Sequence, residues 1–237
     1  MDTMKRKTIG VIGAMEAEVS YLKEKLESPK VFPIAGMEFV LGELNGLDVV
    51  VVRSGMGKVN AGICAHTLAR EFGCSSIINT GVAGSLDNAM DIGDFVLSLD
   101  AAQHDYDVSP IGFKKGEIPY TGIVCFPADK ELLEKAKLAV AQAAPEAKAF
   151  LGRVCSGDQF IIDVAKKEDI ASTFHGLCCE MEGAAVAQAC YLNRVKFVII
   201  RCISDKPDGS EILDFETFAS QAALACSKVV LAMLESL

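Results

Sequence analysis

The sequence lacks any apolar stretch of about 18 residues, which is the length that a helix needs to cross a bilayer, so no membrane span is expected. It also lacks an excess of cations, because 23 Lys and Arg stand against 32 Asp and Glu and give a formal net charge of −9. A negative chain is repelled by nucleic-acid backbones and by anionic membranes. Small molecules and other proteins remain as the expected partners.

Signals for export, disulfides and metals are lacking as well. The charged segment Met1–Lys7 is followed by a short apolar run with a glycine, which is too short for a signal-peptide core. Nine cysteines at irregular spacing are not typical of a disulfide framework. We therefore expect reduced thiols, packed as small core residues in a cytoplasmic protein. A nucleophilic cysteine in the pair Cys178-Cys179 stays open as an alternative.

The three histidines share no spacing typical of metal ligands, so neither a metal site nor another cofactor is expected. The segment His104-Asp105-Tyr106-Asp107 could hold a cation, and a plain polar loop is the alternative for it.

What the sequence does contain is a regular alternation of strand-like and helical segments. Hydrophobic residues make up 51% of the chain, and no linker interrupts them, so we predict one α/β domain over residues 1–237. The pattern favours a three-layer α/β/α fold with a central, mixed and twisted sheet. Asn45-Gly46 predicts a β-hairpin, and residues 103–119 predict a long functional loop. Helices are predicted over residues 16–27, 58–72, 129–143, 164–174, 180–192 and 215–234.

Five short turns each follow a hydrophobic strand-like run. In an α/β sheet such turns can converge on one ligand pocket. We expect this pocket to hold the acids Glu18, Glu182 and Asp205 with almost no cations beside them, which points to acid/base chemistry on a neutral molecule. The turns are Gly13-Ala14-Met15-Glu16, Ser54-Gly55-Met56-Gly57, Thr80-Gly81-Val82-Ala83-Gly84, Ser156-Gly157-Asp158 and Ser204-Asp205.

The turn Gly55-Met56-Gly57-Lys58 does not match a phosphate-binding loop. Such a loop needs glycine where Val52 stands and Ser or Thr where Val59 stands. We interpret it as a tight turn from a strand to a helix.

Acidic residues near strand and helix ends have both structural and functional interpretations. Glu180-Met181-Glu182 is predicted to open a helix, where acids are common because they favour the positive end of the helix dipole. Glu182 also shares a face with apolar residues, and this favours a ligand-facing role. Arg201 could belong to a buried ion pair. Asp205 lies beyond the end of its strand, beside Ser204, which can orient it by a hydrogen bond.

Six segments in this order closely resemble the bacterial 5'-methylthioadenosine/S-adenosylhomocysteine nucleosidases of the nucleoside phosphorylase superfamily. The likeness runs from about residue 8 to the end of the chain. The segments are Gly10-Val11-Ile12-Gly13-Ala14-Met15-Glu16-Ala17-Glu18, Ser54-Gly55-Met56-Gly57-Lys58-Val59, Asn79-Thr80-Gly81-Val82-Ala83-Gly84, Ser156-Gly157-Asp158-Gln159-Phe160-Ile161, Glu180-Met181-Glu182 and Arg201-Cys202-Ile203-Ser204-Asp205.

The resemblance implies hydrolysis of an N-glycosidic bond without a cofactor, which releases adenine and a 5-thioribose in methionine salvage. By motif position, Asp205 resembles the general acid at adenine N7, Ser204 its orienting neighbour, and Glu18 the carboxylate that activates water. The remaining residues resemble contacts to the ribose, the base and the site walls: Met15, Ala83, Gly84, Phe160, Ile161, Glu180, Met181, Glu182 and Arg201.

The resemblance also implies a homodimer. Phe215 and, from a second subunit, Met56, Val108, Ile111 and Pro119 look like the wall around the 5'-alkylthio group. The chain departs from the family at Val82, where Ser is frequent, and at Ile111, where an aromatic residue is common. Lys206-Pro207 after the key acid is a further departure. These changes could alter substrate preference.

The chemistry of the reaction agrees with these residue types. Adenine leaves more easily as a neutral molecule, so a positioned acid must protonate N7. Carboxylates then stabilise the positive charge that develops on the ribosyl group. Residues 9–22 contain no Lys or Arg, and this favours water over phosphate as the nucleophile. Hydrolysis of another adenosyl nucleoside, of the aminodeoxyfutalosine type, a phosphorylase and a non-catalytic nucleoside-binding protein remain alternatives.

Overall fold

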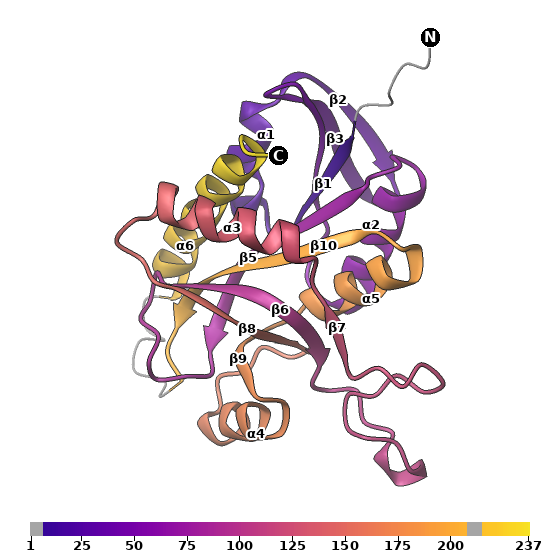
Figure 1. Cartoon of the computed structure of the whole chain (residues 1–237), viewed down its shortest axis with the longest axis vertical. Coiled ribbons are helices and arrows are strands. Elements are labelled where there is room, and N and C mark those ends of the chain that lie inside the picture. Colours follow the sequence, from indigo (N-terminus) through magenta and orange to yellow (C-terminus); the bar gives the residue numbers. More distant parts are fainter. Residues whose placement is uncertain (1–6, 208–214) are drawn as a thin grey trace.

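The computed structural model describes residues 7–207 and 215–237, with the side chains of the second segment described from residue 218. Ten strands form one sheet, and helices cover both of its faces (Figure 1). This arrangement confirms the predicted three-layer α/β/α fold with a mixed central sheet. None of the helices in these two segments is both long enough and apolar enough to cross a membrane.

The N-terminal part of the sheet is built around strand β1, Thr8–Gly13. It pairs in parallel with β4, Leu47–Arg53, and with β5, Ser76–Ser85. Beyond β4, the antiparallel strands β3, Met37–Leu44, and β2, Glu27–Ile34, form one edge. The hairpin at Asn45-Gly46 is confirmed, and both residues adopt the positive φ angles, 52° and 81°, that such a turn requires.

The other part of the sheet closes on itself, which the sequence analysis did not predict. Strand β10 pairs with β5 and with β6, β6 pairs with β8, β8 with β9, and β9 returns to β5. The register of this ring places Gly84 opposite both Cys179 and Asp205. It therefore gathers the ends of distant strands in one place. The bounds of these strands are β6 Phe95–Gln103, β8 Ala149–Ser156, β9 Gly176–Glu180 and β10 Lys196–Asp205. Strand β7, Cys125–Pro127, pairs antiparallel with β6.

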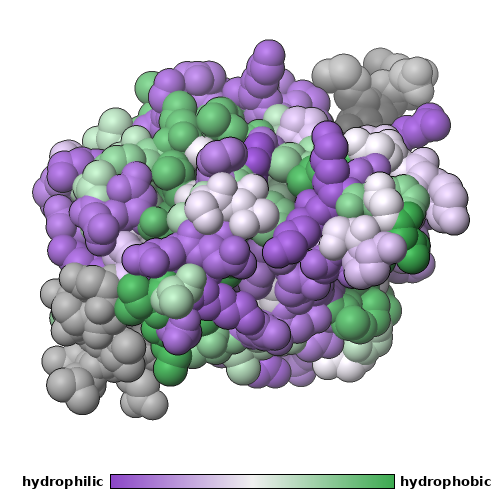
Figure 2. Space-filling view, turned by 90° about the horizontal axis from the view of Figure 1, so that it is seen from below, coloured by the Kyte–Doolittle hydropathy of each residue, from purple (hydrophilic) through white to green (hydrophobic). Residues whose placement is uncertain are grey.

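The helices form two layers with a separate hydrophobic core on each face of the sheet. One layer comprises α1, Ser20–Lys25, α3, Lys130–Ala143, and α6, Phe215–Leu234. The other comprises α2, Lys58–Arg70, and α5, Gly183–Asn193. Helix α4, Val164–Phe174, lies apart from both layers beside β8 and β9, over a small third core (Figure 1). Figure 2 shows the face seen from below Figure 1, where hydrophilic side chains predominate and apolar ones gather in separate areas.

Two predicted helices differ from the structure. Residues 16–27 form a 3₁₀ turn, Glu16–Glu18, then the short α1, and then the start of the exposed edge strand β2. Residues 180–192 do not begin as a helix either, because Glu180 ends β9 and Glu182 is the N-cap of α5. The predicted loop over residues 103–119 is confirmed as largely irregular, with one 3₁₀ turn at Ser109–Ile111.

Candidate active site

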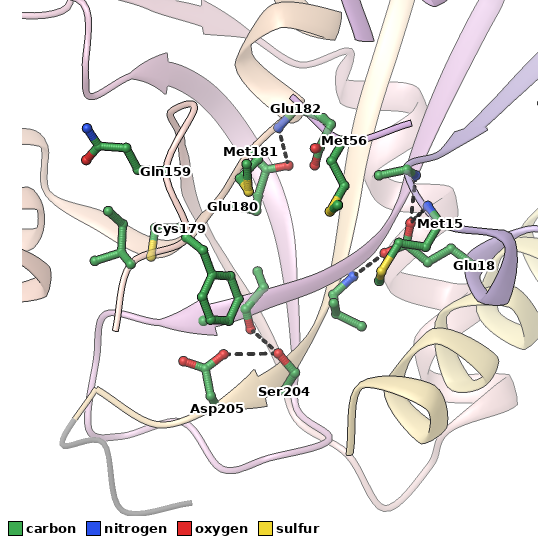
Figure 3. A pocket seen from close by; sticks show the side chains of 16 residues that line it. Met15, Glu18, Met56, Gln159, Cys179, Glu180, Met181, Glu182, Ser204 and Asp205 are labelled. Atoms are coloured by element: carbon green, nitrogen blue, oxygen red, sulfur yellow. Dashed lines mark hydrogen bonds between the residues drawn. The ribbon is translucent and has the colours of Figure 1, made fainter. Parts of the chain in front are cut away.

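One cavity of about 460 Å³ lies where the ends of the strands meet, which is a typical volume for a small-molecule site. All five segments that the sequence analysis singled out contribute to it, directly or through the residues that follow, so the predicted convergence is confirmed. Two of them are not turns, because residues 80–84 belong to β5 and residues 204–205 end β10. Figure 3 shows Ser204 and Asp205 on one side of this cavity and Met15 and Glu18 on the other. The lining residues are Ala14, Met15, Glu18, Met56, Val82, Ala83, Gly84, Gln159, Phe160, Ile161, Cys179, Glu180, Met181, Glu182, Ser204 and Asp205.

Glu18 is buried and is held by the backbone. The N–H groups of Ala14 and Met15 donate to its Oε2 at 2.7 and 2.9 Å, and that of Val82 donates to Oε1 at 3.2 Å. Burial raises the pKa of this carboxyl above its usual range, while the charge of Arg201 and the three N–H donors oppose the increase. The carboxylate is therefore fixed in position, with a stronger affinity for a proton than an exposed glutamate has.

Glu182 is buried on the side of the cavity formed by the turn before α2. The N–H of Gly57 donates to its Oε1 at 2.7 Å. Burial, together with repulsion from Glu180, raises the pKa of Glu182 to about 8. Near neutral pH this side chain can therefore exist as a carboxyl that donates a hydrogen bond or as a carboxylate that accepts one.

Arg201 and Glu180 form the buried ion pair that the sequence analysis considered. The guanidinium also donates to Asn79 Oδ1 at 2.6 Å, and Ser156 Oγ donates to Glu180. Burial disfavours the charged guanidinium, but Glu180 and Glu18 outweigh it and raise the pKa of Arg201 further. Arg201 does not line the cavity and acts from behind Glu180, while its buried Nε has no hydrogen-bond partner among the described residues.

Asp205 is not an unpaired acid, which corrects the expectation of a site almost without cations. Lys167 Nζ donates to its Oδ2 at 2.6 Å, and the side chain of Lys167 is only 3% exposed. On the other oxygen, Ser204 Oγ donates to Oδ1 at 3.1 Å, as its assigned orienting role requires. Lys167 was missed by the sequence analysis. Its spacing from Ile170 and Phe174 on α4 places it on a buried apolar face, and this was the available signal.

Two glycines of β5 make room for the two acids. A Cβ on Gly81 would lie 2.5 Å from Glu18 Oε1, and a Cβ on Gly84 would lie 2.8 Å from Asp205 Oδ2. Side chains cannot approach a Cβ so closely. Strand β5 therefore needs glycine at both positions to let both carboxylates lie against its backbone.

The segment after β8 forms an exposed wall of the cavity. Phe160 lines the cavity and is 60% exposed, and Gln159 and Ile161 flank it. A ring in this position offers a flat face on which an aromatic ligand can stack. Met181 and Met56 add flexible apolar side chains to the lining.

The resemblance assigned four residues of a second subunit to the 5'-alkylthio wall, and only one of them lines the cavity of its own chain. Met56 lines the cavity of its own chain, although the resemblance placed it in a second subunit. Val108, Ile111 and Pro119 do not line it, and Ile111 is largely exposed on the long loop. The side chain of Phe215 lies outside the part of the chain whose side chains are described.

Neither Lys58, at the start of α2, nor the pair Cys178-Cys179 is placed for the functional role that was weighed for it. Lys58 Nζ donates to Asp105 Oδ1 at 2.6 Å and to Gln103 Oε1 at 3.0 Å, so its charge is paired within the protein. Burial raises the pKa of Cys178 and brings that of Cys179 to about 12. Thiols in this state are poor nucleophiles at neutral pH.

No group of three or more His, Cys, Asp or Glu residues is arranged to hold a metal ion in the described segments.

Known proteins resemble this chain over nearly its whole length. Residues 8–235 match the family described as the phosphorylase superfamily. A 5'-methylthioadenosine/S-adenosylhomocysteine nucleosidase from Shewanella sediminis is 42% identical over 230 residues, which cover 97% of this chain and 99% of the relative. The crystal structure of the nucleosidase of the same name from Neisseria meningitidis, in complex with methylthio-immucillin-A, has a TM-score of 0.92 at 37% identity and covers 98% of this chain and 100% of that one.

A futalosine hydrolase from Helicobacter pylori also superposes, with a TM-score of 0.91 at 29% identity, covering 98% of each chain. The matches extend over nearly the whole chain, and the cavity holds acids at the positions of the motifs. The chain therefore belongs to the phosphorylase superfamily and, within it, to the 5'-methylthioadenosine/S-adenosylhomocysteine nucleosidase family.

Proposed function

We propose that the protein hydrolyses the N-glycosidic bond of 5'-methylthioadenosine and S-adenosylhomocysteine, and also that of 5'-deoxyadenosine. The products are adenine and the corresponding ribose, which is a 5-thioribose for the first two substrates. The observation that carries this proposal is the placement of two differently held acids, Asp205 and Glu18, on opposite sides of one cavity.

Asp205 is the proposed general acid. It lies at the end of the cavity bordered by Ser204 and Gly84, and the exposed ring of Phe160 lines the same cavity. A purine stacked on Phe160 would direct N7 towards this carboxyl. Asp205 would give its proton to N7, so that the bond to the sugar breaks and adenine leaves as a neutral molecule.

Glu18 is the proposed base that positions and activates water. Its raised proton affinity suits the removal of a proton from water at neutral pH. The buried Nε of Arg201 needs an acceptor. A water held between this donor and Glu18 would provide one. Val82, which stands where the family often has Ser, contributes its backbone N–H to Glu18 but no hydroxyl.

Glu182 is the proposed contact to the ribose hydroxyls. It lies beside Met181 in the cavity, and its backbone N–H donates to Glu180 Oε2 at 3.1 Å. The positive charge that develops on the sugar in the transition state would lie near Glu18 and Glu182 and be stabilised by them.

Water is favoured over phosphate as the nucleophile by the charges of the site. None of the described residues that line the cavity is Lys or Arg. The nearby cations Arg201 and Lys167 already bind Glu180 and Asp205. A phosphate ion would meet several carboxylates without a free cation to bind it.

A hydrolase for another adenosyl nucleoside, of the aminodeoxyfutalosine type, is the second candidate. The observation in its favour is the futalosine hydrolase structure, which superposes on this chain as well as the nucleosidase structures do. Both candidates share the proposed acid and base and differ in the group carried at the 5' position of the ribose.

We also propose that the protein acts in the cytoplasm as a homodimer. The outer faces of α2 and α5 expose large apolar side chains, with Val59 at 72% and Leu192 at 67% exposure, and Met56 connects this surface to the cavity. A second copy packed there would cover these side chains. Its long loop could then bring Val108, Ile111 and Pro119 to the neighbouring cavity, which they do not reach in their own chain.

The test is a turnover assay with a panel of adenosyl nucleosides in the presence and absence of phosphate. We expect free adenine from the two thioadenosines at a rate that does not depend on phosphate, with the free sugar as product. A sugar phosphate formed in proportion to phosphate would contradict hydrolysis. Efficient release from an aminodeoxyfutalosine-type substrate alone would select the second candidate, and binding without release would indicate a nucleoside-binding protein.

A further inference from the structure

Lys167 is a buried lysine that the proposed reaction does not yet use. It lies on α4, which follows the segment with Phe160 and Ile161. Its ammonium donates to Asp205 Oδ2 at 2.6 Å and to the carbonyl oxygen of Lys206 at 2.9 Å. Through these two hydrogen bonds, the ammonium links the Asp205 side chain and the backbone of Lys206 to helix α4.

The surroundings of Asp205 make Lys167 its main charged neighbour in the described segments. From β10, Ser204 Oγ donates to the carboxylate, and from β5 the backbone of Gly84 lies against it. From β9, Cys179 is the neighbour of the pair, and burial raises the pKa of its thiol to about 12, so the thiol is neutral. The side chain of Asp205 is only 13% exposed, so solvent screens the attraction of Lys167 weakly.

We propose that Lys167 is a positioning residue for the reaction, which anchors the Asp205 carboxyl at the base end of the cavity by binding one of its oxygens. This inference rests on the proposed role of Asp205. It names a residue that controls that acid without touching the substrate.

Lys167 and Ser204 hold the two oxygens of the Asp205 side chain from different elements, α4 and β10. A side chain bound at both oxygens keeps one orientation towards the base, and this favours proton transfer to N7. Asp205 gives its proton to N7 and is protonated again from water after adenine has left.

The experiment compares kcat and KM of Lys167→Met, Lys167→Arg and the unchanged protein on 5'-methylthioadenosine and on a 4-nitrophenyl 5-methylthioriboside, whose leaving group departs as an anion without being protonated. Methionine keeps the apolar stem and removes the ammonium. We expect Lys167→Met to lose roughly 10-fold in kcat on 5'-methylthioadenosine, with KM little changed, and to stay close to the unchanged protein on the riboside. Lys167→Arg, which can still donate to Asp205, should recover most of the loss. Lys137→Met, which removes an exposed cation from α3, is the matched control and should change neither rate.

A purely structural role would lower the rate of Lys167→Met equally on both substrates, and this result would overturn the inference. A loss in Lys167→Arg as large as that in Lys167→Met would overturn it as well. If the methionine variant does not fold, Lys167→Gln makes the same comparison with a neutral donor. Asp205→Asn is measured alongside: full turnover in this variant refutes the proposed acid, whereas lost turnover in Asp205→Asn with unchanged turnover in Lys167→Met refutes only the role of Lys167.

Discussion

The two acids at opposite sides of the cavity are held in different ways. Glu18 is fixed by three backbone N–H groups from the turn after β1 and from β5. Asp205 is held by two side chains, Ser204 from its own strand and Lys167 from α4. Backbone donors change only if the fold changes. Side-chain donors can differ between relatives while the fold remains.

The position of Glu18 is therefore set by the fold, whereas the position of Asp205 can be changed by substituting one of its side-chain partners. A residue that activates water needs a fixed position and a raised affinity for a proton, and burial within a ring of N–H donors provides both. A residue that donates a proton needs a carboxyl directed at its leaving group. A side-chain partner such as Lys167 can change this direction through a single substitution.

The largest loss of activity is expected from a change of Glu18, the acid that is held by backbone N–H groups. Glu18→Gln should lower kcat roughly 100- to 10,000-fold, because the amide cannot accept a proton from water and its NH₂ group would face N–H donors. Steady-state release of adenine measures the effect. Unchanged kcat would show that Glu18 does not activate water.

The two glycines allow each acid to be displaced separately. Gly84→Ala should lower kcat roughly 10- to 100-fold, because its Cβ would lie 2.8 Å from Asp205 Oδ2 and push the carboxyl away. Gly81→Ala should do the same through Glu18, at 2.5 Å. If the roles differ as proposed, Gly84→Ala should lose activity only on substrates whose leaving group must be protonated, whereas Gly81→Ala should lose activity on all substrates. Equal losses in both variants on every substrate would argue against distinct roles.

Glu182 provides a test on stability. Its pKa in the folded protein is raised from 4.5 to about 8, so the folded state binds the proton more tightly than the unfolded chain does. Its contribution is fully present below pH 4.5 and is lost as the pH rises through about 8. We expect Tm to fall between pH 5 and pH 8 by a few °C more in the unchanged protein than in Glu182→Gln. The same dependence in both proteins would contradict the raised pKa.

The smallest effect on turnover is expected at the proposed dimer surface. Leu192→Asp places a charge among exposed apolar side chains of α5 and should convert the dimer to a monomer, as measured by sedimentation or light scattering. We expect adenine release to fall less than in the variants of the acids, with the largest loss for substrates that carry a bulky 5' group. A monomeric unchanged protein would refute the proposed dimer.

Local signals were sufficient to predict much of the fold. Asn45-Gly46 specified the β3–β4 hairpin, and Asp129 caps α3 at the predicted start of that helix. Strand β2 was missed because it is an exposed edge strand with Pro33 and a positive φ at Ser28, so it shows no alternation of buried residues. The closure of β5, β10, β6, β8 and β9 depends on long-range pairing, which no short sequence pattern encodes.

The acids of the site could be identified from their positions at strand ends and from the family resemblance, whereas their partners could not. Glu18 and Asp205 both line the cavity as expected. The pairing of Asp205 with Lys167 joins residues 38 positions apart in the sequence, on a strand and a helix. Only the apolar spacing around Lys167 indicated that its charge is buried and needs a partner.

The central claim, that Asp205 protonates the leaving base, is tested most directly by changing the leaving group. A 4-nitrophenyl 5-methylthioriboside releases nitrophenolate, which departs as an anion without being protonated. We predict that Asp205→Asn loses at least roughly 100-fold in rate on 5'-methylthioadenosine but stays close to the unchanged protein on this riboside, while Glu18→Gln loses activity on both. An equal loss on both substrates in Asp205→Asn would contradict the account.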